Sequence, residues 1–260
     1  MRYKRHSPEE RIKFFQLANN EVKPAYSKQL CGGEMPYPIG LDLRGRAVLV
    51  VGGGKVATRK VARLLDEGAV IRLVSPNLSK AIQQWATEGR LTLYKRPYRS
   101  EDMVGMQLVF ATTNNHSVNA QVAVDAHQRG LWVNVADGMT LGDFTLPAIA
   151  TFGPLQLAID TGGGGPALSR RLRQHLTETF DPGWGRGAAI FSTLRPLVRP
   201  LYNEETRRRF WRTLARDLPD AAVGPYEELV TWIEQASQES GLILDQTAIH
   251  VALQRALAQS

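Results

Sequence analysis

The sequence is poor in residues that bind metals or form disulfides. It has one cysteine, Cys31, and 5 histidines in 260 residues. A lone thiol cannot form an internal disulfide. Without a cysteine cluster or a histidine pair at i, i+4 spacing, no fixed zinc or iron–sulfur site is indicated. His116 and His127, on one predicted helix, are therefore expected to have surface or capping roles.

Long apolar runs are also lacking. No stretch approaches the roughly 20 apolar residues of a membrane span, and the N-terminus has no apolar signal core. With a single thiol, the natural setting for such a chain is the reducing cytoplasm, away from membranes. Hydrophobic residues make up 43% of the chain, enough for a sizeable core in one large domain or two modest ones.

Positive charge is in excess, with a net charge of +7. Between Arg170 and Asp217 there are eleven arginines and five acidic residues. Such a patch could meet a polyanionic small molecule, nucleic acid or only water. Aromatic residues are interleaved with this charge, but Phe210, Leu214 and Leu218 have the helical spacing of a core stripe. The pattern therefore favours a core helix over a nucleic-acid surface.

A glycine turn follows the first strongly apolar run. Residues 47–51 (AVLVV) are typical of a strand buried on both faces of a parallel sheet, and Gly52-Gly53-Gly54-Lys55-Val56-Ala57 then opens an amphipathic helix. Gly52 would allow a tight turn, Gly54 would let the backbone approach phosphates, and Ala57 stands where helix and strand pack closely. Because a helix N-terminus offers free N–H groups to an anion, this segment predicts a dinucleotide site.

The end of the second strand, residues 70–74, departs from the usual NAD pattern. An acidic residue normally binds the ribose there, but this chain has Ser75-Pro76-Asn77. Ser75 and Asn77 could bond the ribose through neutral groups. Arg72 and Lys80 could instead meet a 2′-phosphate, although each taken singly is better explained as a solvated charge. The chemistry alone leaves NAD and NADP open.

Strands and helices alternate from Leu41 onward, which argues for a doubly wound parallel sheet. Asn77 is expected to cap a helix through about Thr87. After Thr140 the pattern changes to two strands joined at Gly153-Pro154, a basic helix to about Phe180, and a break at Asp181-Pro182-Gly183-Trp184-Gly185. The further predicted strands are 91–94, 108–111, 131–135, 144–150 and 155–159. The helix after the fourth strand is expected to end near Arg129. The C-terminal helices are predicted near 187–201, 204–217, 225–239 and 245–258.

Several motifs in order resemble one family. They are Gly52 to Lys60 (GGGKVATRK), Ala111-Thr112, Asn134-Val135-Ala136-Asp137, Phe144 to Ala148 (FTLPA) and Gly162 to Arg173 (GGGGPALSRRLR). Together they resemble the precorrin-2 dehydrogenase family of sirohaem synthesis, which includes bifunctional dehydrogenase–ferrochelatases. The resemblance implies NAD-dependent oxidation of precorrin-2 to sirohydrochlorin in an interlocked homodimer. Some family members then insert ferrous iron, a lyase step that gives sirohaem.

The resemblance also implies an architecture. It is an α/β fold in which a Rossmann-type parallel sheet is followed by a strand-containing dimerisation region and a small helical C-terminal domain. The expected domains are an N-terminal appendage over 1–34, a Rossmann domain over 35–142, a dimerisation region with glycine loop and basic helix over 143–180, and a helical domain over 181–260. Gly164-Gly165 replaces a segment that carries Ser or Thr in some relatives, so regulation through that hydroxyl does not carry over.

Roles follow by position. Lys55 and Val56 would line the pyrophosphate turn, Asn77 and Leu78 would lie beside the adenosine ribose, and Asp137 matches the family's catalytic carboxylate. The complete expected cofactor set is Gly52, Gly53, Gly54, Lys55, Val56, Ala57, Ser75, Asn77, Leu78 and Thr112. The expected substrate set is Asn134, Gly163, Gly164, Arg170 and Arg173.

The chemistry fits this assignment. A carboxylate such as Asp137, at the carboxyl end of a strand, can take the proton that leaves as the nicotinamide accepts a hydride, and it could also serve during iron insertion. Arg170, Arg171 and Arg173 could hold acetate or propionate arms of the substrate. They could equally face solvent or pair at a dimer interface.

Three other functions compete. One is another NAD(P)-dependent reductase of a small anionic substrate, which would need a catalytic Lys or His motif that is not evident. The second is a non-catalytic NAD(P)-sensing module, which would usually keep the acidic ribose contact and lack the Asp137 and Gly162–Arg173 constellation. The third, a nucleic-acid binder, predicts salt-sensitive retention on DNA.

Overall fold

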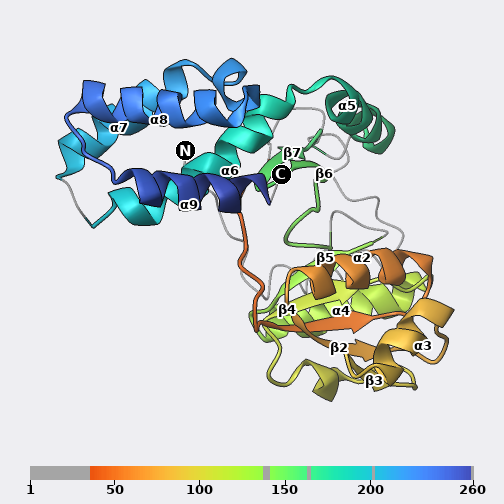
Figure 1. The fold of residues 1–260 in the computed structure, drawn as a ribbon. Coiled ribbons are helices and arrows are strands. Elements are labelled where there is room, and N and C mark those ends of the chain that lie inside the picture. The colour runs from red at the N-terminus through yellow and green to blue at the C-terminus, as the bar shows by residue number, and fades with distance from the viewer. Residues whose placement is uncertain (1–35, 137–140, 163–164, 201–202, 259–260) are drawn as a thin grey trace, which may run out of the picture. The chain divides into compact units, whose positions relative to one another are not determined.

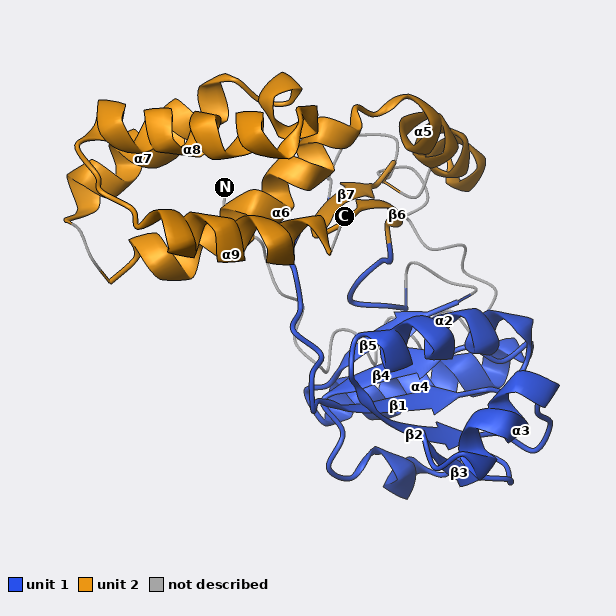
Figure 2. Cartoon of the chain, in the orientation of Figure 1, with its two compact units in different colours: residues 1–146 blue, residues 147–260 orange. Residues whose placement is uncertain are grey.

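The computed structural model describes residues 36–136, 141–162, 165–200 and 203–258. These form two compact units that divide between Leu146 and Pro147 (Figure 2). The expected appendage, residues 1–34, and the candidates Asp137, Gly163 and Gly164 lie outside the described residues.

Unit 1 is built on a five-stranded parallel sheet in the order β3-β2-β1-β4-β5 (Figure 1). The order reverses at the β1/β4 pair, which is where doubly wound sheets open a ligand crevice. The predicted parallel α/β sheet is therefore confirmed. The strands are β1 (Ala47–Val51), β2 (Val70–Val74), β3 (Thr92–Tyr94), β4 (Leu108–Ala111) and β5 (Trp132–Val135).

Helices cover both faces of this sheet because its central strands are apolar on both sides. On one face, Val48, Val50 and Phe110 share a core with Ala57 and Val61 of α2. The opposite face forms a second core with α4. The helices of unit 1 are α2 (Lys55–Asp66), α3 (Lys80–Thr87), the 3₁₀ turn η2 (Ser100–Met103) and α4 (His116–Gln128).

The start of α3 differs from the sequence prediction. The N-cap is Ser79, whose hydroxyl accepts a hydrogen bond from the Ile82 N–H at 3.3 Å. Asn77 was expected to cap this helix, and that prediction is wrong. Asn77 lies two residues earlier, and its carbonyl oxygen accepts a 2.7 Å hydrogen bond from Ser75 Oγ.

Unit 2 begins with the predicted antiparallel hairpin, followed by helices. Its second strand, β7 (Leu155–Ile159), has the predicted bounds, but the first, β6 (Ala148–Phe152), was predicted over 144–150 and begins four residues later. A break between helices occurs where it was expected, since α5 ends at Thr179 and α6 begins at Pro182, but it is shorter than the predicted Asp181-Pro182-Gly183-Trp184-Gly185. Asp181 is an N-cap, Pro182 begins α6, and the two glycines continue that helix. A β-carbon at Gly183 would overlap Pro219, and one at Gly185 would lie 2.8 Å from the Phe152 carbonyl oxygen. These glycines therefore mark close backbone approaches inside a helix.

The helices of unit 2 enclose a core of their own. Phe210 and Leu214 are fully buried in it and Leu218 packs against it, which confirms the predicted core stripe. In the described ranges, no helix is long and apolar enough to cross a membrane. The helices are α5 (Pro166–Thr179), α6 (Pro182–Val198), α7 (Glu204–Arg216), η3 (Asp220–Val223), α8 (Tyr226–Ser240) and α9 (Gln246–Leu257).

Candidate dinucleotide site

Gly52 and Thr112 meet at the point where the strand order reverses. Gly52 has a φ of +116°, which side chains of L-residues rarely allow, and a β-carbon there would lie 2.8 Å from the Thr112 carbonyl. Thr112 bonds back to the end of β1, since its N–H and its Oγ1 each donate to the Val51 carbonyl oxygen at 2.8 Å. The tight turn predicted from Gly52 is therefore observed, and Thr112 is fixed beside it.

Gly53 presses against the loop between β2 and α3. A β-carbon at Gly53 would overlap the Asn77 carbonyl oxygen and would lie 3.0 Å from Leu78 Cδ2. The Gly53 carbonyl also accepts a hydrogen bond from the Ser79 N–H at 2.9 Å. Gly53 was expected only to line the cofactor site, with no separate packing role. In the structure it joins two of the expected cofactor segments.

The N-terminus of α2 is open to an anion. Gly54 is its N-cap and supplies no side-chain hydrogen bond, so the first N–H groups, at Lys55, Val56 and Ala57, lack a capping side chain. A β-carbon at Gly54 would meet nothing within 4 Å, whereas Ala57 is completely buried against the sheet. These features fit a dinucleotide pyrophosphate, with N–H groups and the helix dipole directed at its charge.

The end of β2 offers neutral groups. Ser75 is 5% exposed, and its hydroxyl donates to the Asn77 carbonyl, so its hydrogen is used within the loop. Asn77 is exposed and Leu78 is half-buried. A second hydroxyl pair, Thr58 Oγ1 and Ser79 Oγ at 2.8 Å, ties α2 to the cap of α3. The glycine turn and the β2–α3 loop are thus held as one structure.

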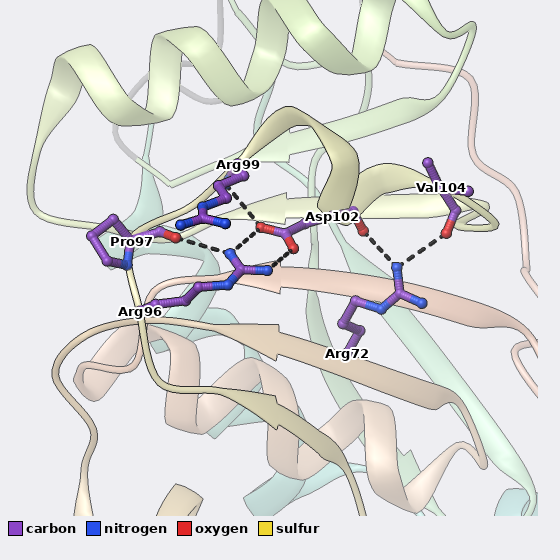
Figure 3. A network of polar contacts seen from close by, with 6 residues as sticks. All are labelled: Arg72, Arg96, Pro97, Arg99, Asp102 and Val104. Carbon is purple, nitrogen blue, oxygen red and sulfur yellow. Dashed lines mark hydrogen bonds and ion pairs between the residues drawn. The ribbon is translucent and has the colours of Figure 1, made fainter.

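Arg72 is held by η2 (Figure 3). Its Nη1 donates to the carbonyl oxygens of Asp102, at 2.8 Å, and Val104, at 3.0 Å. The Asp102 carboxylate accepts two hydrogen bonds from Arg96, at 2.6 and 2.9 Å, and one from the Arg99 N–H, at 2.8 Å. Burial on its own would raise the pKa of Asp102, but these hydrogen bonds lower it below its ordinary value. Lys80, the other candidate for a 2′-phosphate, is exposed at the first position of α3.

The carboxyl end of β5 is packed tightly. Asn134 is 6% exposed, accepts a hydrogen bond from Lys60 Nζ and donates one to the Phe144 carbonyl at 2.8 Å. Nearby, His127 Nε2 lies 3.2 Å from Asp143 Oδ2, while His116 is the first residue of α4. Asp137 itself lies outside the described residues. Among the residues that the structure describes, no group of three His, Cys, Asp or Glu side chains could hold a metal ion.

In unit 2, Arg170 and Arg173 lie on α5 and are exposed, as is Arg171. Gly165 caps this helix, and the buried Ser169 donates to its carbonyl oxygen at 3.3 Å. The glycines expected to work with these arginines, Gly163 and Gly164, lie outside the described residues.

These features define the class of the protein. A parallel sheet with order 3-2-1-4-5, a glycine turn at the switch point and an uncapped helix N-terminus form a Rossmann-type dinucleotide-binding unit. Comparison with known families agrees. Residues 39–148 match the model described as putative NAD(P)-binding, and residues 153–179 match the model of the central part of a sirohaem biosynthesis protein.

Individual relatives narrow the class. A siroheme synthase of Xylella fastidiosa (strain M12) is 39% identical over 211 residues, covering 79% of this chain and 42% of that protein. One from Nitrosococcus oceani is 33% identical over 216 residues, covering 82% and 46%. Among solved structures, SirC, a precorrin-2 dehydrogenase, superposes with a TM-score of 0.66 at 28% identity, over 78% of this chain and 100% of its own.

The chain therefore belongs to the family of the sirohaem synthase N-terminal region and the SirC-like precorrin-2 dehydrogenases. It spans less than half the length of the siroheme synthases that it matches.

Proposed function

We propose that this chain oxidises precorrin-2 to sirohydrochlorin, with NAD as the hydride acceptor, in sirohaem biosynthesis. The observation that carries the proposal is the glycine turn between β1 and α2, held against Thr112 and the β2–α3 loop, in a chain of this family. A binding site of this kind orients a nicotinamide dinucleotide at the carboxyl edge of the sheet.

NAD rather than NADP is supported by the position of Arg72. A 2′-phosphate needs a cation beside the ribose, and the guanidinium of Arg72 is already engaged by two carbonyl oxygens around η2. Of the groups expected beside the ribose, Ser75 and Asn77 are neutral and suit ribose hydroxyls, while Lys80, exposed at the start of α3, is the cation that the comparison of NAD with NADP has to test.

The reaction removes a hydride and a proton from the substrate, and the bound dinucleotide supplies the hydride acceptor. We assign the proton to Asp137 because it comes two residues after β5 in the sequence, and β5 ends at the edge of the sheet where the glycine turn also lies. A carboxylate in this place acts as a general base in its ionised form.

Substrate carboxylates would be held by unit 2. The exposed guanidiniums of Arg170 and Arg173 follow a glycine-rich segment at the start of α5, where N–H groups and positive charge favour carboxylates. Gly163 and Gly164 complete the proposed substrate set in unit 2. Asn134, also expected in that set, is 6% exposed and its amide already bonds Lys60 and the Phe144 carbonyl, so we do not retain it as a direct substrate contact.

We also propose a homodimer. A two-stranded hairpin is marginally stable by itself, and α5 next to it exposes Leu168 by 61% and Leu172 by 40%. A second copy that covers this surface would remove apolar area from water. Light scattering of the purified chain tests this directly, because a monomer at micromolar concentration would contradict it.

The experiment for the activity is anaerobic incubation of the purified protein with precorrin-2 and either NAD or NADP, followed by the absorbance of sirohydrochlorin. We expect oxidation with NAD and a much slower reaction with NADP. Ferrous iron added afterwards tests insertion against the protein-free rate. No oxidation with either dinucleotide would overturn the proposal and would favour a non-catalytic NAD(P)-sensing module.

A further inference from the structure

Lys60 is a charged residue on the sheet-facing side of α2. The neighbours that point into the core from this helix, Ala57, Val61 and Leu64, are apolar and buried. Lys60 lies beside them, half-buried, with its ammonium 5.3 Å from the centre of the Phe110 ring. A lysine in this position loses hydration, so its contacts have to compensate.

The contacts of the ammonium come from β5 and β4. Lys60 Nζ donates to Asn134 Oδ1 and lies over the face of Phe110 as a cation–π contact. An ammonium can only donate, so the Asn134 amide must direct its oxygen at Lys60 and its nitrogen away. The nitrogen then donates to the Phe144 carbonyl at 2.8 Å, and the Phe144 ring meets Phe110 edge-to-face at 5.6 Å.

Asn134 thereby joins β5 to the chain that follows it. The Asp143 N–H donates to the Val133 carbonyl at 2.8 Å, and the Val133 N–H donates to Asp143 Oδ2 at 3.0 Å. Directly after β5, the Ala136 N–H donates to the carbonyl of Ala111, the last residue of β4, at 2.9 Å. Residues 136 and 143–144 are thus both tied to the sheet, and the Asn134 amide is one of the ties.

We propose that Lys60 is a positioning residue for the site at the carboxyl end of the sheet. It acts through the Asn134 amide, which accepts from Lys60 and donates to the Phe144 carbonyl. This inference rests on the proposed function, because its main test measures kcat for the oxidation of precorrin-2. Lys60 stands five residues beyond the first residue of α2, so it is not part of the pyrophosphate turn.

A purely structural role would not need the charge. Burial lowers the pKa of Lys60 to about 8, and the like charge of Arg59 adds to this effect, whereas Asn134 and Phe110 are neutral. An apolar side chain of similar length would fill the same space without the loss of hydration. What such a side chain cannot do is donate to Asn134 Oδ1, so the orientation of the amide would then depend on its hydrogen bond to the Phe144 carbonyl without the support of Lys60.

The test compares Lys60→Met with Arg63→Met, which removes the same charge from an exposed position of the same helix. For Lys60→Met we expect kcat for precorrin-2 to fall about ten- to hundredfold, with the Kd of NAD within about twofold of the wild type. Lys60→Arg should recover part of the loss, since it keeps a donor. Arg63→Met should change neither quantity.

A double-mutant cycle then separates positioning from packing. If Lys60 acts through Asn134, Lys60→Met should have little further effect on kcat in an Asn134→Ala background. Additive losses, or wild-type kcat in Lys60→Met, would overturn the proposal. NAD binding by fluorescence and thermal unfolding show that each variant is folded.

Failure of the proposed function is recognised separately. If the wild type does not oxidise precorrin-2, the NMR signals of the Asn134 side-chain amide still test whether Lys60 orients that amide. Lys60→Met should shift these signals and speed their hydrogen exchange, and Arg63→Met should not. Unchanged signals in Lys60→Met would refute the proposed orientation of the amide.

Discussion

The α-carbon of Gly52 comes so close to Thr112 that an added β-carbon would lie 2.8 Å from the Thr112 carbonyl carbon and 2.9 Å from its Oγ1. The two residues follow β1 and β4, which are neighbours in the sheet although two β-strands, two α-helices and the 3₁₀ turn η2 separate them in sequence. Their contact joins the ends of β1 and β4 at the point where the strand order reverses. The dinucleotide site thus depends on a glycine for both its φ and its lack of a side chain.

Gly52→Ala should therefore weaken NAD binding. The substitution forces either a strained φ or a displacement of Thr112, at about 1–3 kcal/mol, so we expect at least a roughly fivefold rise in the Kd of NAD. Gly40→Ala is the matched control, because a β-carbon at Gly40 meets nothing within 4 Å. Fluorescence titration with NAD measures both. Equal affinities in the two variants would contradict the importance of this contact.

Asp137→Ala should strongly slow the oxidation of precorrin-2 while NAD still binds. Removal of a general base typically lowers the rate about 10²- to 10⁴-fold. Stopped assays of sirohydrochlorin formation measure kcat, and fluorescence titration measures the Kd of NAD. Asp66→Ala, at the exposed end of α2, is the control for loss of a carboxylate. A fully active Asp137→Ala enzyme would refute the assignment.

Arg72→Met should change stability rather than dinucleotide choice. Loss of the two hydrogen bonds to the Asp102 and Val104 carbonyls is expected to lower the free energy of unfolding by about 1–3 kcal/mol. The ratio of the Kd values for NADP and NAD should stay within about twofold of the wild type. Lys80→Met serves as comparison at the start of α3. A changed ratio in Arg72→Met would mean that this guanidinium reaches the ribose.

Asp102 should make the fold sensitive to acid. Its pKa is lowered in the folded state, so its contribution to stability is complete above the unfolded pKa of about 4 and is lost as pH falls through the folded value. We expect Asp102→Asn to reduce the free energy of unfolding by about 1–3 kcal/mol at pH 7. The difference from the wild type should shrink below about pH 4.

Urea unfolding at neutral and acid pH measures this difference. The control is Asp42→Asn, because the Asp42–Arg44 pair is exposed and is expected to add nothing measurable. A constant difference between Asp102→Asn and the wild type at all pH values would show that the Asp102 carboxylate is not the group that titrates.

Much of unit 1 could be predicted because its signals are local. The run Ala47–Val51 is apolar at every position, as a strand covered on both faces must be, and the observed β1 has the same bounds. β2 and β4 were also predicted at their observed bounds. The caps were harder. Asn77 and Ser79 are both good N-cap residues, and the choice of Ser79 depends on Gly53 and Ser75, which use the Asn77 segment for packing.

The break expected at Asp181-Pro182-Gly183-Trp184-Gly185 shows the same dependence. Glycine and proline punctuate a sequence, but Asp181 and Pro182 are also the residues that begin a helix. Which of the two meanings holds depends on Pro219 and Phe152, whose backbones approach Gly183 and Gly185 and leave no room for a side chain.

The sequence by itself therefore determined the parallel sheet, the glycine turn, the hairpin, the core stripe of Phe210, Leu214 and Leu218, and the resemblance to the family. Each of these depends on consecutive residues or on a short repeat along the chain. The tertiary structure alone decided which groups are already engaged. Arg72 donates to the Asp102 carbonyl of η2, and the Asn134 amide bonds Lys60 and Phe144. Gly53 lies so close to the Asn77 carbonyl that a side chain would not fit. These partners are far apart in the chain, and a hydrogen bond depends on distances that only the folded backbone sets.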